Sequence, residues 1–236
     1  MQYTLCARLG DHQAAHWIVL GLALIALVLI WPWYKAVKRK RLVEDVPTSK
    51  VKGVAIGLCE VKGAARRSDA FTSYLAGLQT VWYRYNVSEH WKKTVTETYT
   101  DSNGKRRTRR KTKSGWKTVQ SDEISGLFFL EDESGAIQIN PHKAKVEGRQ
   151  VFSTYCTASD PLYYGKGPRY SVSHSTGRRH FTEHAIVLDD PLYVMGTARL
   201  RQDAVAAEIA YDQDDPLFLI STRSESQIRS GYGLRD

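Results

Sequence analysis

The stretch HFTEH, from His180 to His184, carries the side chains of the sequence best suited to chemistry. It fits the pattern H-x-x-E-H, in which two histidines on one face of a helix hold zinc and the glutamate acts as the general base of a metallopeptidase. The motif also needs a further ligand from elsewhere in the chain. The pattern therefore suggests one hypothesis, a zinc site made of His180, Glu183 and His184.

The neighbours of this stretch favour a β-strand instead. The segment is rich in β-branched and aromatic residues, and it runs into LDDPLYVMG, a turn followed by a second apolar run. In a strand, His180 and His184 share one face while Glu183 lies on the other, so base and ligands would point apart. We therefore predict a polar strand with no catalytic residue, metal or cofactor, and the zinc peptidase stays as the remote alternative.

Positive charge is concentrated in two stretches of the 236-residue chain, which has a formal net charge of +9. The first stretch has five basic and no acidic residues: Lys35, Lys38, Arg39, Lys40 and Arg41. The second has eight and again no acidic residue: Lys105, Arg106, Arg107, Arg109, Arg110, Lys111, Lys113 and Lys117. Since these stretches contribute +13, the remaining residues sum to −4. Partners are therefore to be sought at the two basic stretches.

A transmembrane helix is predicted over residues 13–34, between an N-terminal tail (1–12) and a basic juxtamembrane linker (35–49). No Asp, Glu, Lys or Arg interrupts 13–34, and about 20 apolar residues in a helix cross a bilayer. Trp17 and Trp31 are placed as headgroup-level aromatic residues. A cleaved signal peptide, the alternative, would need a basic start and a small-residue cleavage site. The basic residues after the helix predict a single-pass membrane protein with its N-terminus outside and its C-terminal domain on the cytoplasmic side.

The following part, residues 50–225, has the pattern of a β-rich soluble domain, and a polar tail (226–236) comes after it. Short alternating runs such as GVAIGLCEVKG, VWYRYNV and LFFLEDESGAIQIN are separated by glycines and turns. Two short helices are expected, from Ser68 and from Gln202. Three Asp-Pro-Leu sequences predict turns that lead into strands, at Asp160, Asp190 and Asp215. The fold class is mainly β, a β-rich α+β domain preceded by one transmembrane helix.

The second basic stretch contains Asn103-Gly104, a strong hairpin-turn signal, between threonine-rich flanks. The simplest interpretation of this stretch is a solvated, mobile loop, with which two functional interpretations compete. Two partners fit its chemistry. Anionic headgroups attract each nearby Lys or Arg by about 1 kcal/mol, and single-stranded nucleic acid could stack on Trp91, Tyr99 and Trp116. The predicted anchor favours the lipid surface, so nucleic acid is the less suitable partner.

Other signals of catalysis are weak. The sequence has no phosphate-binding P-loop, no nucleophile elbow and no dinucleotide-binding fingerprint. Cys6, Cys59 and Cys156 lie far apart without Cys-x-x-Cys spacing, so neither a disulfide framework nor a structural zinc module is expected. The apolar surroundings of Cys59 and Cys156 predict buried, inert thiols.

The strand segments, taken in order, resemble the GIDE domain, also called the beside-a-membrane (BAM) domain. They are GVAIGLCEVKG, VWYRYNVSEHW, LFFLEDESGAIQINPHKA, HFTEHAIVLDDPLYVMGTA and PLFLISTRSE. This domain occurs in a membrane-anchored mitochondrial E3 ubiquitin ligase, and similar domains occur in prokaryotic membrane proteins. The resemblance covers roughly Lys50 to Glu225, and it implies a framework domain beside a bilayer without catalytic residues of its own.

The resemblance also marks framework positions and sets the functional expectation. The matching residues are Tyr83, Arg84, Tyr85, Asp132, Gly135, Glu183 and Gly196. In the eukaryotic ligase a second transmembrane helix and a zinc-binding RING follow the domain, and this sequence shows neither a second apolar run nor RING cysteine spacing. We therefore expect a non-catalytic binding or regulatory module that contacts an anionic membrane or an unidentified acidic protein partner. The alternative is a component or fragment of an E3 ubiquitin ligase with the RING missing.

Overall fold

The fold is given by a computed structural model, which describes residues 48–201, 206–224 and 227. The predicted transmembrane helix, 13–34, and the basic residues from Lys35 to Arg41 lie outside the described residues. Within the described ranges, no helix is both long and apolar enough to cross a membrane. The account below therefore concerns the β-rich domain alone.

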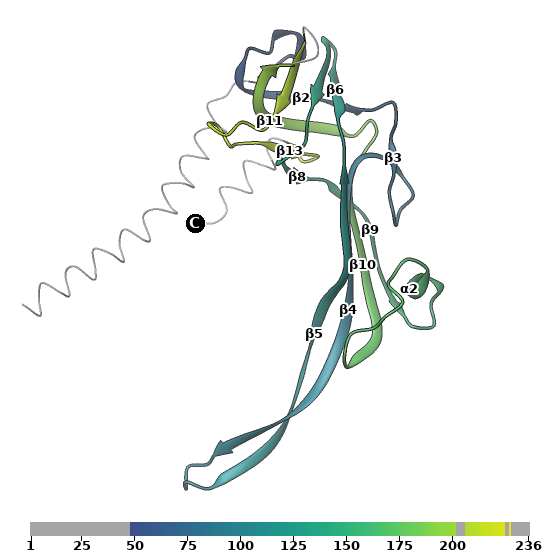
Figure 1. Ribbon diagram of the computed structural model, residues 1–236, viewed down its shortest axis with the longest axis vertical. Coiled ribbons are helices and arrows are strands. Elements are labelled where there is room, and N and C mark those ends of the chain that lie inside the picture. Colours follow the sequence, from purple (N-terminus) through teal and green to yellow (C-terminus); the bar gives the residue numbers. More distant parts are fainter. Residues whose placement is uncertain (1–47, 202–205, 225–226, 228–236) are drawn as a thin grey trace, which may run out of the picture. The chain divides into compact units, whose positions relative to one another are not determined.

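One sheet closes on itself into a small, barrel-like ring (Figure 1). Its five strands, in spatial order, are β2 (Gly57–Arg66), β6 (Phe128–Asp132), β7 (Gly135–Ile139), β12 (Ala207–Ala210) and β11 (Pro191–Leu200). The ring closes because β11 also pairs with β2, and only the β7–β12 pair is parallel. Three short strands extend this sheet: β1 (Thr48–Ser49), β8 (Lys145–Glu147) and β13 (Leu219–Ser221). A 3-10 turn, η1 (Val51–Gly53), follows β1.

The second sheet is antiparallel and is built on one very long hairpin. Its strands are β3 (Phe71–Thr72), β4 (Gln79–Thr100), β10 (Ser175–Val187) and β9 (Arg149–Thr157), with β5 (Arg106–Ser125) paired to β4. A short helix, α2 (Pro161–Gly165), follows β9. The pairing of β10 with β4 ends at Trp91, whereas β4 and β5 continue as a two-stranded hairpin past that point (Figure 1).

Two hydrophobic clusters hold the sheets. The larger one fills the ring with side chains such as Val61, Leu130 and Val194, and Trp82 of β4 joins it. Burial of such side chains stabilises the fold by about 1.5–3 kcal/mol each. The smaller cluster lies on one face of the second sheet around Tyr85, Val87, Cys156, Tyr163 and Phe181.

Several predicted strands and turns are confirmed. HFTEH lies within β10, LFFLEDESGAIQIN forms β6 and β7, and Asn103-Gly104 lies in the turn between β4 and β5. Two of the Asp-Pro-Leu turns lead into strands, β11 and, after a few residues, β13. The predicted fold class, a mainly β domain, is likewise confirmed.

Three expectations were wrong. The segment after Ser68 forms β3 and turns, and the described end of the Gln202 segment forms β12. Its Ala-rich sequence favours a helix, but pairing with β7 and β11 on both sides overrides that propensity. The first Asp-Pro-Leu turn starts α2, because the Asp160 carboxylate accepts a hydrogen bond from the Leu162 N–H and Pro161 takes the first helical position.

The simplest interpretation of the second basic stretch was a loop, but the structure shows a strand. Seven of its eight basic residues, from Arg106 to Lys117, lie on β5, and Lys105 lies in the turn. β5 pairs with β4 continuously from Trp82–Ser125 to Thr100–Arg106, with one irregularity after Val87. The charges are therefore held in an ordered row.

Candidate functional site

The HFTEH segment divides its side chains between the two faces of the sheet. Phe181 and Glu183 are fully buried, whereas His184 is exposed and His180 is half-buried. Glu183 therefore points away from both histidines, as the strand interpretation predicted, so the three side chains do not share the single face that the zinc-peptidase alternative requires. Among the described residues, no group of three or more His, Cys, Asp or Glu side chains is arranged to hold a metal ion.

Glu183 holds a loop against the sheet. Its two carboxylate oxygens accept hydrogen bonds from the backbone N–H groups of Leu75, at 2.9 Å, and Ala76, at 2.8 Å. These N–H groups belong to the turn between β3 and β4, which was predicted to be helical. Because the carboxylate satisfies both donors, Glu183 has a structural role, and the turn needs no helical hydrogen bonds.

A buried ion pair lies nearby on the same face of the sheet. Glu89 and Arg179 are both fully buried, and their side chains are 3.0 Å apart. Arg179 also donates to the backbone carbonyls of Tyr163, Pro168 and Tyr170. The pair thereby fastens the segment that follows β9, including α2, onto the sheet.

Glu89 is the acceptor centre of this network. Burial alone would raise its pKa, but hydrogen bonds from Ser175, Arg179 and Tyr163 and the charge of Arg179 lower the pKa below its ordinary value. Neither Glu89 nor Arg179 was among the predicted residues. The alternation of strand residues could have found them. Glu89 lies two positions after Val87 on the buried face of β4, and Arg179 lies two positions before Phe181 on the buried face of β10.

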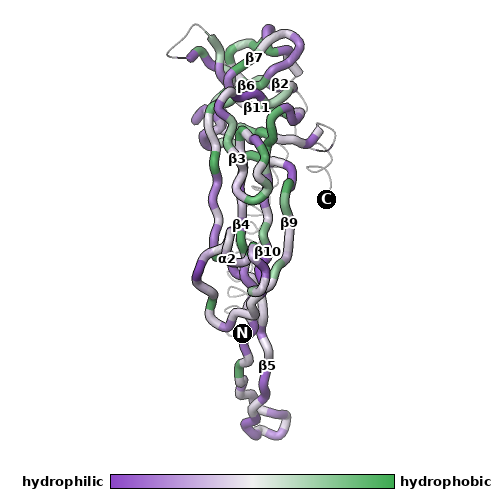
Figure 2. Tube along the Cα trace, turned by 90° about the vertical axis from the view of Figure 1, so that its right-hand side faces the viewer, coloured by the Kyte–Doolittle hydropathy of each residue, from purple (hydrophilic) through white to green (hydrophobic). Residues whose placement is uncertain are grey.

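The candidate functional site is the distal part of the long hairpin, residues 92–117, which we call the arm. From Lys93 onward, β4 has β5 as its only strand partner among the described residues, and no second layer covers it. Nearly all of its side chains are exposed or half-exposed. Figure 2 shows the hydrophilic colouring along this end of β5, in contrast to the hydrophobic segments near the ring.

Charge in the arm is strongly one-sided. The arm contains ten Lys or Arg residues and only two acidic residues, Glu97 and Asp101, so its net charge is +8. Strand alternation places one row of cations on a single face: Arg107, Arg109, Lys111 and Lys113. Glu97 lies within 4 Å of three of them, at 3.3 Å from Arg109 and 3.8 Å from both Lys111 and Lys113. One carboxylate cannot neutralise three cations, so the row stays positive.

The turn at the tip is ordered by Asp101. Its carboxylate accepts hydrogen bonds from the Lys105 and Asn103 N–H groups, and it ion-pairs with Arg107 at 2.7 Å. These contacts, led by the one from Lys105, lower the pKa of Asp101. Gly104 takes φ +73°, a conformation that glycine adopts without strain. The tip is thus fixed by local chemistry that the Asn-Gly signal indicated.

The predicted stacking residues do not gather on one face of the arm. Trp91 covers Gly115, its ring lying 3.3 Å from the position of an added Cβ, and Tyr99 lies under Arg109. Trp116 lies on the opposite face, 5.1 Å from His90 by ring centroids, and Tyr155 stacks on His180 at 3.9 Å. The aromatic rings are therefore divided between the faces, which does not make the continuous stacking platform that single-stranded nucleic acid uses.

The framework positions have structural roles. Tyr85 stacks near Tyr74, with ring centroids 4.4 Å apart, next to the half-buried Tyr83. Arg84 pairs with Glu123 at 2.6 Å on the exposed face.

The three remaining framework residues, Asp132, Gly135 and Gly196, shape turns and packing. Asp132 accepts hydrogen bonds from Ser134, Gly135 and the Val51 N–H, and although burial opposes the shift, these bonds lower its pKa to about 2. A Cβ at Gly196 would lie 2.6 Å from the Phe218 ring, so only glycine fits there.

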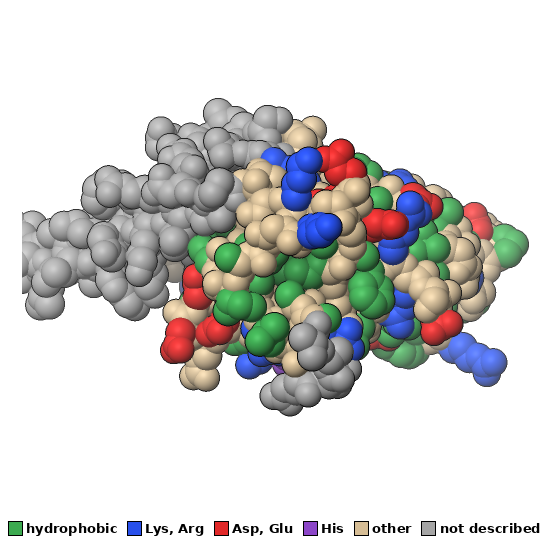
Figure 3. Space-filling model, turned by 90° about the horizontal axis from the view of Figure 1, so that it is seen from above, with side chains coloured by type: hydrophobic (Ala, Val, Ile, Leu, Met, Phe, Trp, Pro, Cys, Tyr) green, Lys and Arg blue, Asp and Glu red, His purple; other side chains and the backbone are tan. Residues whose placement is uncertain are grey.

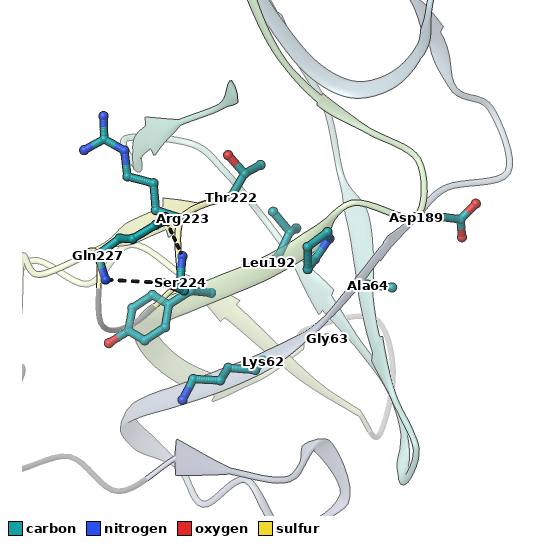
Figure 4. A pocket seen from close by; sticks show the side chains of 11 residues that line it. Lys62, Gly63, Ala64, Asp189, Leu192, Thr222, Arg223, Ser224 and Gln227 are labelled. Atoms are coloured by element: carbon teal, nitrogen blue, oxygen red, sulfur yellow. Dashed lines mark hydrogen bonds between the residues drawn. The ribbon is translucent and has the colours of Figure 1, made fainter. Parts of the chain in front are cut away.

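A pocket of about 930 Å³ lies against β2 and β11 (Figure 4). Its charged lining residues are engaged with neighbours: Lys62 with Glu60, Asp189 with Arg66, and Arg223 with Glu147. The face seen in Figure 3 carries basic and acidic side chains interspersed, unlike the arm. Neither the pocket nor this face gathers charges of one sign as the arm does.

The described thiols are poor nucleophiles. Cys59 and Cys156 are buried and free. Burial raises the pKa of Cys59 to about 11 and also raises that of Cys156, so both stay protonated at neutral pH.

Comparison with known proteins places the chain in a family. The model of the GIDE family, described as E3 ubiquitin ligase, matches residues 96–234, more than half of the chain. The chain belongs to the GIDE family. No match was found among curated proteins or among solved structures. The GIDE match begins within the arm and includes the whole of β5, so most of the arm belongs to the matched region.

Proposed function

We propose that this chain is a membrane-anchored, non-catalytic binding module of the GIDE family, and that its arm contacts the anionic headgroups of a lipid bilayer. The observation that carries the proposal is the row of exposed cations on β5, which Glu97 and Asp101 offset only in part. Each Lys or Arg close to an anionic surface contributes about 1 kcal/mol. Because a strand pair already holds the row in order, little conformational entropy is lost when it meets a surface.

The predicted anchor supplies the geometry of the proposal. We infer a single pass through residues 13–34, with the N-terminus outside and the C-terminal domain on the cytoplasmic side. That leaflet carries the anionic lipids to which basic segments are attracted. The first basic stretch, from Lys35 to Arg41, would then bind the same headgroup layer next to the anchor.

The non-catalytic part of the proposal is supported by the side chains with the best-known chemistry. Glu183 is engaged with two backbone N–H groups, and the histidines of HFTEH lie on the opposite face. Cys59 and Cys156 are buried with raised pKa values. These groups hold the domain together and leave the arm as its exposed chemical feature.

The test uses the full chain in nanodiscs of neutral lipid, mixed with vesicles of increasing anionic lipid content. Co-sedimentation should rise with the anionic fraction and fall with added salt. A variant with four arm cations changed to Gln, at Arg109, Arg110, Lys111 and Lys113, should bind on the order of a hundredfold more weakly. A control with the same loss of charge outside the arm, at Lys50, Lys52, Arg169 and Arg178, should bind like the parent. Equal binding by both variants would remove the arm from the mechanism.

A second proposal follows from the family description alone. The GIDE model is described as E3 ubiquitin ligase, so the chain is proposed as a component of ubiquitin transfer. The measurement is reconstituted ubiquitination with purified activating and conjugating enzymes, with and without this chain. An unchanged rate and pattern of conjugation would count against a ligase role and would leave the lipid contact untouched.

A further inference from the structure

The outer edge of β5 is a second chemical feature of the arm, distinct from its charged side chains. From Arg106 to Lys117, β5 pairs only with β4 among the described residues. A strand paired on one side presents alternate N–H and C=O groups on the other, and such an edge is a template for another strand. We call this stretch of backbone the free edge.

The side chains beside the free edge decide which strand can add to it. Seven Lys or Arg residues and no acidic residue lie between Arg106 and Lys117. A second copy of β5 would place like charges directly opposite one another, which is destabilising. The charge that protects the edge against self-association therefore favours a strand of opposite sign.

The spacing of the cations makes this preference more specific. Arg107, Arg109, Lys111 and Lys113 alternate onto one face, about 6–7 Å apart along the strand. An added strand with an acidic residue at every second position would place each carboxylate next to one of them, about 5 Å away between Cβ atoms. The same four acidic residues in a block would meet at most three cations, because any four consecutive positions of this stretch include Thr108 or Thr112 or extend past Lys113.

The opposite edge of the same arm serves as an internal comparison. On β4, the residues from Lys93 to Thr100 also lack a strand partner other than β5 in the described part of the chain. That edge carries Lys93 and Glu97, whose charges cancel. Both edges offer backbone groups, but only the one on β5 combines them with a row of cations.

We propose that the free edge of β5 binds an extended acidic segment of a partner protein by strand addition, and that the preferred segment has Asp or Glu at every second position. This goes beyond the lipid contact, because headgroups can match the cations but cannot continue a sheet. The two contacts share the same cations and would therefore compete.

The experiment uses the full chain in neutral-lipid nanodiscs and a fluorescent peptide of alternating Glu and Thr. Fluorescence anisotropy should show binding, and hydrogen exchange of the β5 amides should slow when the peptide is bound. A peptide of the same composition with its Glu residues in one block should bind about threefold more weakly, because it loses one charge pair with β5. The alternating peptide methylated on backbone nitrogens along both edges should bind at least about tenfold more weakly, since it keeps the charge but cannot pair.

Two variants of equal charge test the choice of edge. Changing Arg109 and Lys111 to Gln should weaken peptide binding by about tenfold, whereas changing Lys92 and Lys93 to Gln should weaken it by less than about threefold. Equal binding of all three peptides would overturn strand addition in favour of charge alone. Binding to anionic vesicles without binding to the alternating peptide would overturn this inference while leaving the lipid contact standing. If the chain bound neither the vesicles nor the peptide, the lipid contact and the strand addition would both be refuted.

Discussion

At the base of the long hairpin, Glu89 and Arg179 are buried side by side, and their polar atoms have partners within the domain. In the arm of the same hairpin, the cations are exposed and share two carboxylates. The strand β4 belongs to both regions. The difference comes from the layer above: α2 and its flanking segment cover the base, whereas no described segment covers the arm between Lys93 and Lys113. A charge on this hairpin is structural where it is covered and available for binding where it is not.

The largest loss of stability is expected when Arg179 of the covered base is removed. In an Arg179→Ala variant, Glu89 would be buried without its cation, and three backbone carbonyls would lose a donor. Breaking a buried pair in this way costs about 3–5 kcal/mol. Urea unfolding of the full chain in detergent should show this loss. The matched control is Arg84→Ala, which removes an exposed arginine–glutamate pair on the same sheet and should cost less than about 1 kcal/mol. Similar losses in both variants would contradict the comparison.

A smaller effect is expected at Glu183. Glu183→Ala would leave the N–H groups of Leu75 and Ala76 without an acceptor, and an unsatisfied buried donor costs about 1–3 kcal/mol. Hydrogen exchange of these two amides should accelerate more than that of β10. Glu183→Gln keeps one carbonyl oxygen and should fall between the parent and the alanine variant. Unchanged exchange at Leu75 and Ala76 would show that the carboxylate does not hold the turn.

Acid should weaken the base of the hairpin. The pKa of Glu89 is lowered in the folded state, so the unfolded chain binds its proton at a higher pH. The stability from this group is therefore complete above the ordinary glutamate pKa of 4.5 and is lost as pH falls through the folded value. The free energy of unfolding should be measured against pH for the parent and for Glu89→Gln. Their difference should shrink below pH 4.5, and a constant difference would rule out this linkage.

The sequence was informative where local pattern decides structure. Alternation placed Phe181 and Glu183 on the face opposite His180, and Asn103-Gly104 marked the tip of the arm. Contacts between distant segments could not be predicted in the same way. The Glu89–Arg179 pair joins residues 90 positions apart, and its register depends on the whole β4–β10 pairing. For the same reason, the pairing of β7 with β12 in the ring could not be predicted, because the alanines of the β12 segment favour a helix.

The smallest effect on stability is expected where the effect on binding is largest. Changing Arg109, Arg110, Lys111 and Lys113 to Gln removes exposed charges that have little burial to lose, so the free energy of unfolding should change by less than about 0.5 kcal/mol per residue. Relief of repulsion along the row should offset part of the lost contact with Glu97. Urea unfolding and vesicle binding should be measured on the same preparation. A fall in stability as large as that of Arg179→Ala would show that the arm, like the base, uses its charges to hold the fold.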